Sequence, residues 1–225
     1  TDNVVGMPEV EGGGGDPSPV TAYGVYLGMK ASAKQVYGSD SLSGKKIMVQ
    51  GTGKVGMHLV ELLSKENAEI LVSDVDQVSL KLASKEFGAK VIPLSETYST
   101  PMDIYAPCAL GATVNEESLE QLSCAIIAGA ANNQLKDENV NGQMCRDKGI
   151  LYAPDFLINA GGLINVYTEW IGYNRDLAMA KTEKIYEVTT EIIKKAHKED
   201  IPTYLAANRM AEERIEAIGK VQLTY

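Results

Sequence analysis

Three glycines in the first quarter of the chain form a Gly-x-Gly-x-x-Gly pattern, Gly51-Thr52-Gly53-Lys54-Val55-Gly56. An apolar segment typical of a buried strand precedes them, and an amphipathic segment typical of a helix follows. A glycine-rich turn between strand and helix lets a phosphate group reach the free N–H groups at the helix start. Asp74 ends the next apolar strand, about 20 residues further on, where a carboxylate can accept hydrogen bonds from a ribose. This combination predicts a dinucleotide-binding unit.

Each glycine has an expected task in such a unit. Gly51 allows the tight turn, Gly53 lets a pyrophosphate approach the backbone, and Gly56 lets helix and strand pack closely. Asp74 should repel the 2′-phosphate of NADP, so the pattern favours NAD as the cofactor. The alternative is an ordinary turn between strand and helix that is followed by a surface aspartate.

The composition limits the possible functions. The chain has 225 residues, enough for one large domain or a domain with an appendage, and a net charge of −9, which argues against nucleic acid as a partner. No apolar run approaches the length of a membrane span, and no signal peptide is recognised. Three scattered cysteines fit the reducing cytoplasm, and with only two histidines, in helical patterns, we expect no metal site.

The elements that must position these residues alternate along the chain. After a loop or hinge rich in Gly and Pro (6–19), a long helix is predicted over 20–37, with Ser18 or Asp16 as its cap. Strands are expected at 46–50, 69–73, 89–92, 103–106, 124–128 and 149–153, with helices at 55–66, 76–87, 115–121 and 136–147. The pattern then becomes purely helical, over 163–171, 175–198 and 203–220. We expect an α/β fold: a Rossmann-like, doubly wound, mostly parallel sheet with flanking helices and a C-terminal helical appendage.

Five segments, in the same order, resemble the amino-acid dehydrogenase family that includes glutamate, leucine, phenylalanine and valine dehydrogenases. The resemblance runs from about Val4 to Lys220, and the tail around Ile201-Pro202-Thr203-Tyr204 looks most like the leucine enzymes. The matching segments are Gly15-Asp16-Pro17-Ser18-Pro19-Val20-Thr21-Ala22-Tyr23-Gly24, Val49 to Gly56, Ala106-Pro107-Cys108-Ala109-Leu110-Gly111, Ala128-Gly129-Ala130-Ala131-Asn132-Asn133-Gln134-Leu135, and Ala153-Pro154-Asp155-Phe156-Leu157-Ile158-Asn159-Ala160-Gly161-Gly162.

The resemblance implies NAD-dependent oxidative deamination of an L-amino acid to a 2-oxo acid and ammonia. The family's lysine base and aspartate acid/base lie in an N-terminal domain that is missing here, so we expect no catalytic residue in this chain and no turnover by it alone. Residues 1–200 should form the NAD-binding domain, and 201–225 should pack on the missing domain. The full-length protein is expected to be a homo-oligomer. The alternatives are a phenylalanine- or tryptophan-type enzyme and a non-catalytic nucleotide-binding module.

The resemblance also implies which residues contact the cofactor. Thr21 and Asn159 would bind the nicotinamide amide, Asn133 would touch both cofactor and substrate, and Cys108 would line the ribose. Each has a plainer alternative: Ser18 and Thr21 as helix caps, Cys108 as a small buried filler, Asn133 as a turn residue and Asn159 as a cap. The expected cofactor-binding set is Ser18, Thr21, Gly51, Thr52, Gly53, Lys54, Val55, Gly56, Asp74, Val75, Cys108, Ala109, Ala130, Asn133 and Asn159.

Substrate choice is expected to depend on Leu163 and Val166, together with Asn133. By the resemblance, glutamate dehydrogenases usually carry Ser or Thr in place of Val166, so this chain favours an apolar substrate. Leucine dehydrogenases often carry Val where Leu163 stands, and Leu occurs there in relatives that handle aromatic amino acids. Core packing is the alternative for both residues.

Overall fold

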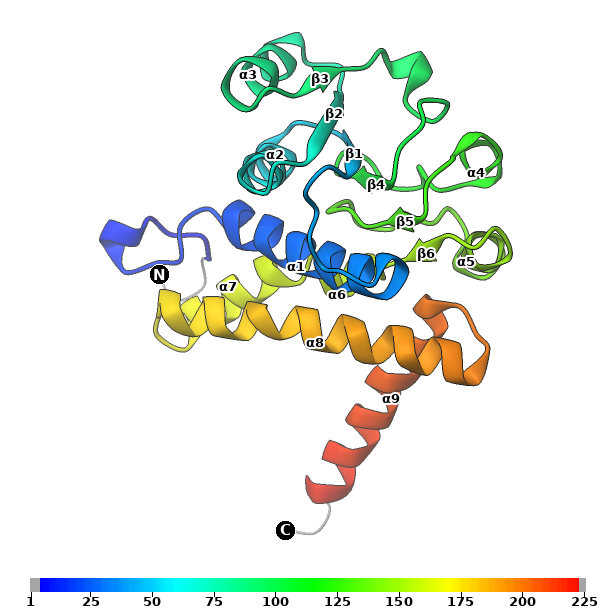
Figure 1. The fold of residues 1–225 in the computed structure, drawn as a ribbon. Coiled ribbons are helices and arrows are strands. Elements are labelled where there is room, and N and C mark those ends of the chain that lie inside the picture. Colours follow the sequence, from blue (N-terminus) through cyan, green and yellow to red (C-terminus); the bar gives the residue numbers. More distant parts are fainter. Residues whose placement is uncertain (1–4, 223–225) are drawn as a thin grey trace.

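The strands of the computed structural model, which describes residues 5–222, form one parallel six-stranded sheet. The outer ends of the two expected domains, Thr1 and Tyr225, and the expected start of the family resemblance, Val4, lie outside the described residues. The strand order is β3-β2-β1-β4-β5-β6, so the chain reverses direction across the sheet between β1 and β4 (Figure 1). This confirms the predicted doubly wound fold. The strands are β1 (Lys46–Gln50), β2 (Glu69–Ser73), β3 (Lys90–Val91), β4 (Ile104–Pro107), β5 (Ile126–Ile127) and β6 (Leu151–Tyr152).

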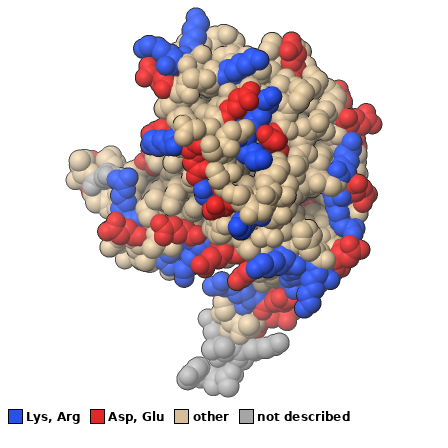
Figure 2. All heavy atoms as spheres, viewed as in Figure 1, with Lys and Arg blue, Asp and Glu red and all other residues tan. Residues whose placement is uncertain are grey.

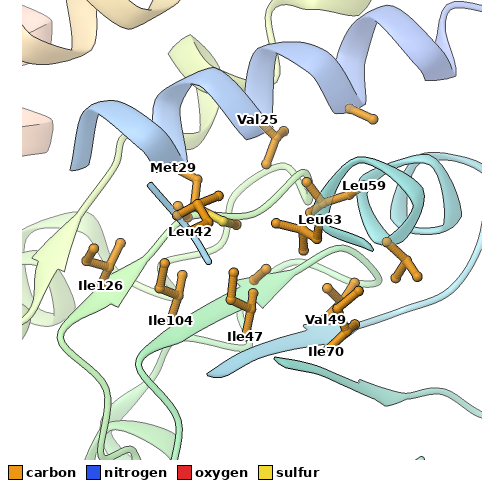
Figure 3. Packing of buried hydrophobic residues seen from close by; sticks show 14 of the residues in the cluster. Val25, Met29, Leu42, Ile47, Val49, Leu59, Leu63, Ile70, Ile104 and Ile126 are labelled. Carbon is orange, nitrogen blue, oxygen red and sulfur yellow. The ribbon is translucent and has the colours of Figure 1, made fainter. Parts of the chain in front are cut away.

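Both faces of the sheet are buried. Successive strand residues point to opposite sides of the sheet, so neighbouring residues of one strand enter different core clusters. In β1, Ile47 and Val49 join one core cluster, and Met48 joins the other. Figure 3 shows part of the first cluster, in which Val25 and Met29 project from a helix toward the layer of Ile47 and Ile104 on the strands. Continuous apolar runs such as Ile70-Leu71-Val72 are what a strand buried on both faces requires.

Helices form a layer on each face of the sheet (Figure 1). Residues of α1 (Ser18–Tyr37), α2 (Lys54–Lys65) and α3 (Gln77–Phe87) belong to the first cluster. Residues of α4 (Glu116–Gln121) and α5 (Glu138–Asp147) belong to the second. Two 3₁₀ turns, η1 (Glu9–Glu11) and η2 (Leu94–Glu96), complete this part of the chain.

The remaining helices pack outside this unit. After α6 (Asp155–Ile158) and α7 (Gly161–Trp170), the long helix α8 (Arg175–Glu199) lies along α1. The last helix, α9 (Thr203–Gln222), buries Tyr204, Ala206 and Ala207 in its first turns, whereas Ile215 and Ile218 are exposed. The first turns of α9 therefore pack on this chain itself, whereas its later turns do not.

The predicted elements are found, with shifts at their ends. The strands expected at 89–92, 124–128 and 149–153 are only two residues long, since the chain leaves the sheet on both sides of the paired residues. The helix expected at 163–171 begins at Gly161, and the preceding short α6 was not predicted. The loops that follow two of these short strands, β5 and β6, line part of the candidate site.

Candidate cofactor and substrate site

The glycine loop lies at the carboxyl end of β1, beside the end of β2. Asp74, just past β2, accepts hydrogen bonds from the Thr52 backbone N–H and, at 3.1 Å, from the Thr52 hydroxyl. The Asp76 N–H donates to its other oxygen at 2.9 Å. Burial raises the pKa of Asp74, but these hydrogen bonds outweigh it and leave the pKa below its usual value. The carboxylate is thus ionised at neutral pH and already fixed beside the loop.

Two of the three glycines are required by the protein's own packing. Gly51 has a φ of +103°, and a Cβ there would lie 2.7 Å from the Ala109 nitrogen. A Cβ on Gly56 would lie 1.9 Å from the Gly51 carbonyl oxygen. Gly51 therefore lets the ends of β1 and β4 meet, and Gly56 lets α2 start against β1.

Gly53 is different, because nothing in the protein calls for a glycine there. Its φ of −66° suits any residue, and no atom lies within 4 Å of where its Cβ would be. Gly53 is also the N-cap of α2, with no side-chain cap. The N–H groups at the start of α2 and the open space above Gly53 fit a pyrophosphate that approaches the backbone closely.

The start of α1 is tied to this loop. Asp16 accepts from the Ser18 hydroxyl at 2.6 Å and from the Ser18 N–H at 2.9 Å. The expected cap is wrong, because the N-cap of α1 is Pro17, which has no side-chain cap, and Ser18 is already inside the helix. Lys54 pairs with Asp16 at 3.0 Å. The Ser18 hydroxyl, the Ser18 N–H and Lys54 lower the pKa of Asp16 to about 2. Ser18 and Lys54 are thereby engaged with Asp16.

A second group of predicted residues lines an open cavity of about 450 Å³. This cavity lies on the side of β1 away from β2, toward the loops that follow β5 and β6. Thr21 lies in its wall and donates its hydroxyl hydrogen to the Pro17 carbonyl at 2.9 Å, which leaves the oxygen lone pairs free to accept. The sequence predicted five of the lining residues and missed three. The predicted ones are Thr21, Val55, Ala130, Asn159 and Leu163, and the missed ones are Asn132, Phe156 and Ala160.

The asparagines of this region have distinct positions. Asn159 donates to the Asn132 side-chain oxygen at 2.7 Å and to the Ala130 carbonyl at 3.2 Å, so it joins two loops instead of capping α7, whose N-cap is Ala160. Asn133 is exposed, with a φ of +52°, and does not line the cavity. Its contact with cofactor and substrate stays a prediction. Its neighbour Asn132, in the same motif, is the asparagine that faces Asn159.

Other predicted contacts lie around the rim. Cys108 follows β4 against the glycine loop, and burial raises the pKa of its thiol to about 12, as expected of a packing residue without thiol chemistry. Ala109 is exposed beside it, and Val75, after Asp74, is 79% exposed.

The apolar side of the cavity is formed by Phe156 and Leu163, which are 45% and 73% exposed. Val166 lies a turn further along α7, half-buried, and does not line the cavity. Exposed apolar side chains around a concave site are typical of a surface that a substrate or another protein segment covers.

Charge and composition add little else to the chemistry of this region. Among residues 5–222, no group of His, Cys, Asp or Glu side chains is arranged to hold a metal ion. Lys and Arg lie among Asp and Glu over the face shown in Figure 2. No helix in the described part of the chain is long and apolar enough to cross a membrane.

The fold and the site together define a dinucleotide-binding α/β protein. The glycine loop and Asp74 lie next to the point where the strand order reverses, which is where doubly wound sheets bind ligands. The chain also matches the Glutamate/Leucine/Phenylalanine/Valine dehydrogenase family over residues 12–80 and 72–222, and it belongs to that family of NAD(P)-dependent dehydrogenases.

Individual relatives are similar over nearly the whole chain. Leucine dehydrogenase of Thermoactinomyces intermedius is 50% identical over 99% of this chain. The crystal structure of L-tryptophan dehydrogenase from Nostoc punctiforme superposes with a TM-score of 0.88 at 44% identity, covering 91% of this chain and 61% of that one. The hetero-hexameric glutamate dehydrogenase from Thermus thermophilus shares the fold, with a TM-score of 0.78 at 21% identity over 97% of this chain and 57% of that one. The chain spans about 60% of the length of the leucine dehydrogenase.

Proposed function

We propose that this chain is the NAD-binding part of a leucine-dehydrogenase-like enzyme, which oxidatively deaminates a branched-chain L-amino acid to the 2-oxo acid and ammonia. The observation that carries the cofactor assignment is the open space above Gly53 beside an ionised Asp74. When bound, NAD supplies the hydride acceptor. The residues of this chain bind and orient it.

NAD is favoured over NADP by the surroundings of Asp74. The adenosine ribose would lie at the end of β2, where Asp74 accepts hydrogen bonds and its charge opposes a 2′-phosphate. Asp76, two residues on, adds a second carboxylate, whose pKa is lowered by the Val78 and Ser79 N–H groups. The pair makes this end of the site negatively charged.

The apolar character of Phe156 and Leu163 supports an apolar amino acid as substrate. The 50% identity to a leucine dehydrogenase, against 45% to a tryptophan dehydrogenase and 45% to a phenylalanine dehydrogenase, favours a branched-chain substrate. A phenylalanine- or tryptophan-type activity is the second candidate, because Leu163 is the residue seen in relatives that handle aromatic amino acids.

The complete protein is proposed to be a cytoplasmic homo-oligomer. The three cysteines of the described chain are free thiols, which supports a reducing compartment. A hetero-hexameric relative supports assembly into multimers. The general base and acid are proposed to lie outside this chain, so the chain alone should bind NAD without turning over.

The experiment is a substrate panel on the full-length protein. NADH formation is followed at 340 nm with L-leucine, L-isoleucine, L-valine, L-phenylalanine, L-tryptophan and L-glutamate. The proposal expects the highest kcat/KM for a branched-chain amino acid and none measurable for glutamate. A preference for phenylalanine or tryptophan would support the second candidate. NAD binding with no oxidation of any of them would mark a non-catalytic nucleotide-binding module.

A further inference from the structure

Gln134 is a completely buried amide next to the candidate nicotinamide side of the site. Its Nε2 donates to two backbone carbonyls, that of Gly129 at 2.8 Å and that of Ala131 at 2.9 Å. Its Oε1 has no hydrogen-bond partner. Methionine would fill a similar volume without that buried, unpaired oxygen, but it could not hold the two carbonyls.

Asp155 is the second buried polar residue of this region, with 6% of its surface exposed. Its Oδ2 accepts from the Gln134 N–H at 2.9 Å, and its Oδ1 accepts from the Phe156 N–H at 2.7 Å. One carboxylate thus joins the loop after β5 to the start of α6.

These contacts lie directly behind the cavity wall. The loop whose carbonyls bind the Gln134 amide contains Ala130 and Asn132. The segment that begins at Asp155 contains Phe156 and leads to Asn159. On the cavity side, Asn159 joins the same two segments by hydrogen bonds to Ala130 and Asn132. The wall is therefore held from behind by two buried residues and from the front by one.

We infer that Gln134 and Asp155 are positioning residues that set the wall against which the nicotinamide ring lies. The inference rests on the proposed function, because it needs NAD to lie across β1 with its adenosine at Asp74. In that orientation the two residues act on the nicotinamide half alone. The glycine loop and Asp74 make no hydrogen bond to either of them in the described structure.

The test compares ligands with and without the nicotinamide ring. ADP-ribose, NAD and NADH are titrated against the chain and against Gln134→Met, which keeps the volume and removes the two donors. Asp155→Asn is a second, gentler variant that keeps one acceptor oxygen. Asn141→Leu is the matched control, since Asn141 is also a buried, hydrogen-bonded amide but lies in α5, away from the cavity.

For Gln134→Met, we expect NAD binding to weaken by about tenfold or more, equivalent to about 1.4 kcal/mol, with ADP-ribose binding nearly unchanged. The change in emission that NADH shows on binding should also be lost, since it reports the surroundings of the dihydronicotinamide ring. Asp155→Asn should shift both readouts in the same direction by less. Asn141→Leu should change neither, even if its melting temperature falls.

Several results would overturn the inference. The first is a Gln134→Met variant with an unchanged ratio of NAD affinity to ADP-ribose affinity and an unchanged NADH emission. The second is a variant that loses affinity for NAD and for ADP-ribose equally. The third is a wild-type chain for which the nicotinamide ring adds neither affinity nor a change in emission. If Gln134→Met does not fold, the same readouts on Asp155→Asn decide. Failure of wild type to bind ADP-ribose would instead contradict the proposed cofactor site itself.

Discussion

The two halves of the site, on either side of β1, are built in different ways. The half proposed to bind the adenosine (the adenosine half) comes from one continuous strand–turn–helix–strand segment, and its carboxylate is already hydrogen-bonded to the loop it faces. The half proposed to bind the nicotinamide (the nicotinamide half) is assembled from segments far apart in the chain, around Thr21, Ala130, Phe156 and Leu163, and it is an open cavity with exposed apolar side chains. The first half is shaped by local geometry, whereas the second depends on tertiary contacts.

The largest effect should come from breaking the local geometry. Gly56→Ala places a Cβ on the Gly51 carbonyl oxygen, so α2 cannot close on β1. We expect unfolding to become easier by about 1–3 kcal/mol and NAD binding to be lost. Thermal unfolding and calorimetric titration measure the two effects.

Gly53→Ala is the matched control, because its new Cβ meets only open space. It should leave the melting temperature unchanged or raised and still weaken NAD binding. If Gly53→Ala binds NAD as tightly as the wild type does, the open space is not where the pyrophosphate lies.

In the nicotinamide half, Asn133→Gly in the full-length protein should lower kcat by about a hundredfold, the cost of a misplaced substrate. Glycine tolerates the left-handed backbone at this position, so stability should be kept. Asn133→Ala would add backbone strain and a lower melting temperature. A fully active Asn133→Gly would identify Asn133 as a turn residue.

Asp74→Ala should weaken NAD binding by about 1.5–3 kcal/mol, the loss of hydrogen bonds to a charged group, and should narrow the gap between NAD and NADP. Part of this loss is indirect, because Thr52 loses its acceptor as well. Thr52→Val keeps the N–H contact with Asp74 and removes the hydroxyl contacts with Asp74 and Ser79, so its effect on NAD binding measures the hydroxyl's share of the indirect loss. An unchanged ratio of the two affinities would make Asp74 an ordinary surface residue.

The smallest effect should be on substrate choice. Leu163→Val in the full-length protein should shift the preference between phenylalanine and leucine by roughly 1–3 kcal/mol or less, as for one methylene. Val166→Ala, at a half-buried residue away from the cavity, should shift it less. If the wild type, Leu163→Val and Val166→Ala have identical substrate profiles, Leu163 does not belong to the substrate site.

The difference between local geometry in one half of the site and tertiary contacts in the other explains what the sequence could predict. The strand–turn–helix periodicity around Gly51 and Asp74 is local, so the sheet and the place of the glycine loop beside Asp74 could be predicted from pattern alone. Asn132, Phe156 and Gln134 carry no local signal, because their roles come from contacts between the loops after β5 and β6. The resemblance indicated the segment that carries both asparagines. Asn132 lines the cavity, and the role of Asn133 stays a prediction. The burial of the first turns of α9 depends on α8, which covers Ala206 and Ala207, and on the second core cluster, which includes Tyr204. No pattern within α9 reveals these contacts.

The most direct test of the account is a titration of the chain with NAD and with NADP under identical salt and pH. We predict that NAD binds, and that it binds more tightly than NADP, because the Asp74 carboxylate would accept hydrogen bonds from a ribose and repel a 2′-phosphate. Binding of NADP as tight as that of NAD, or tighter, would contradict it.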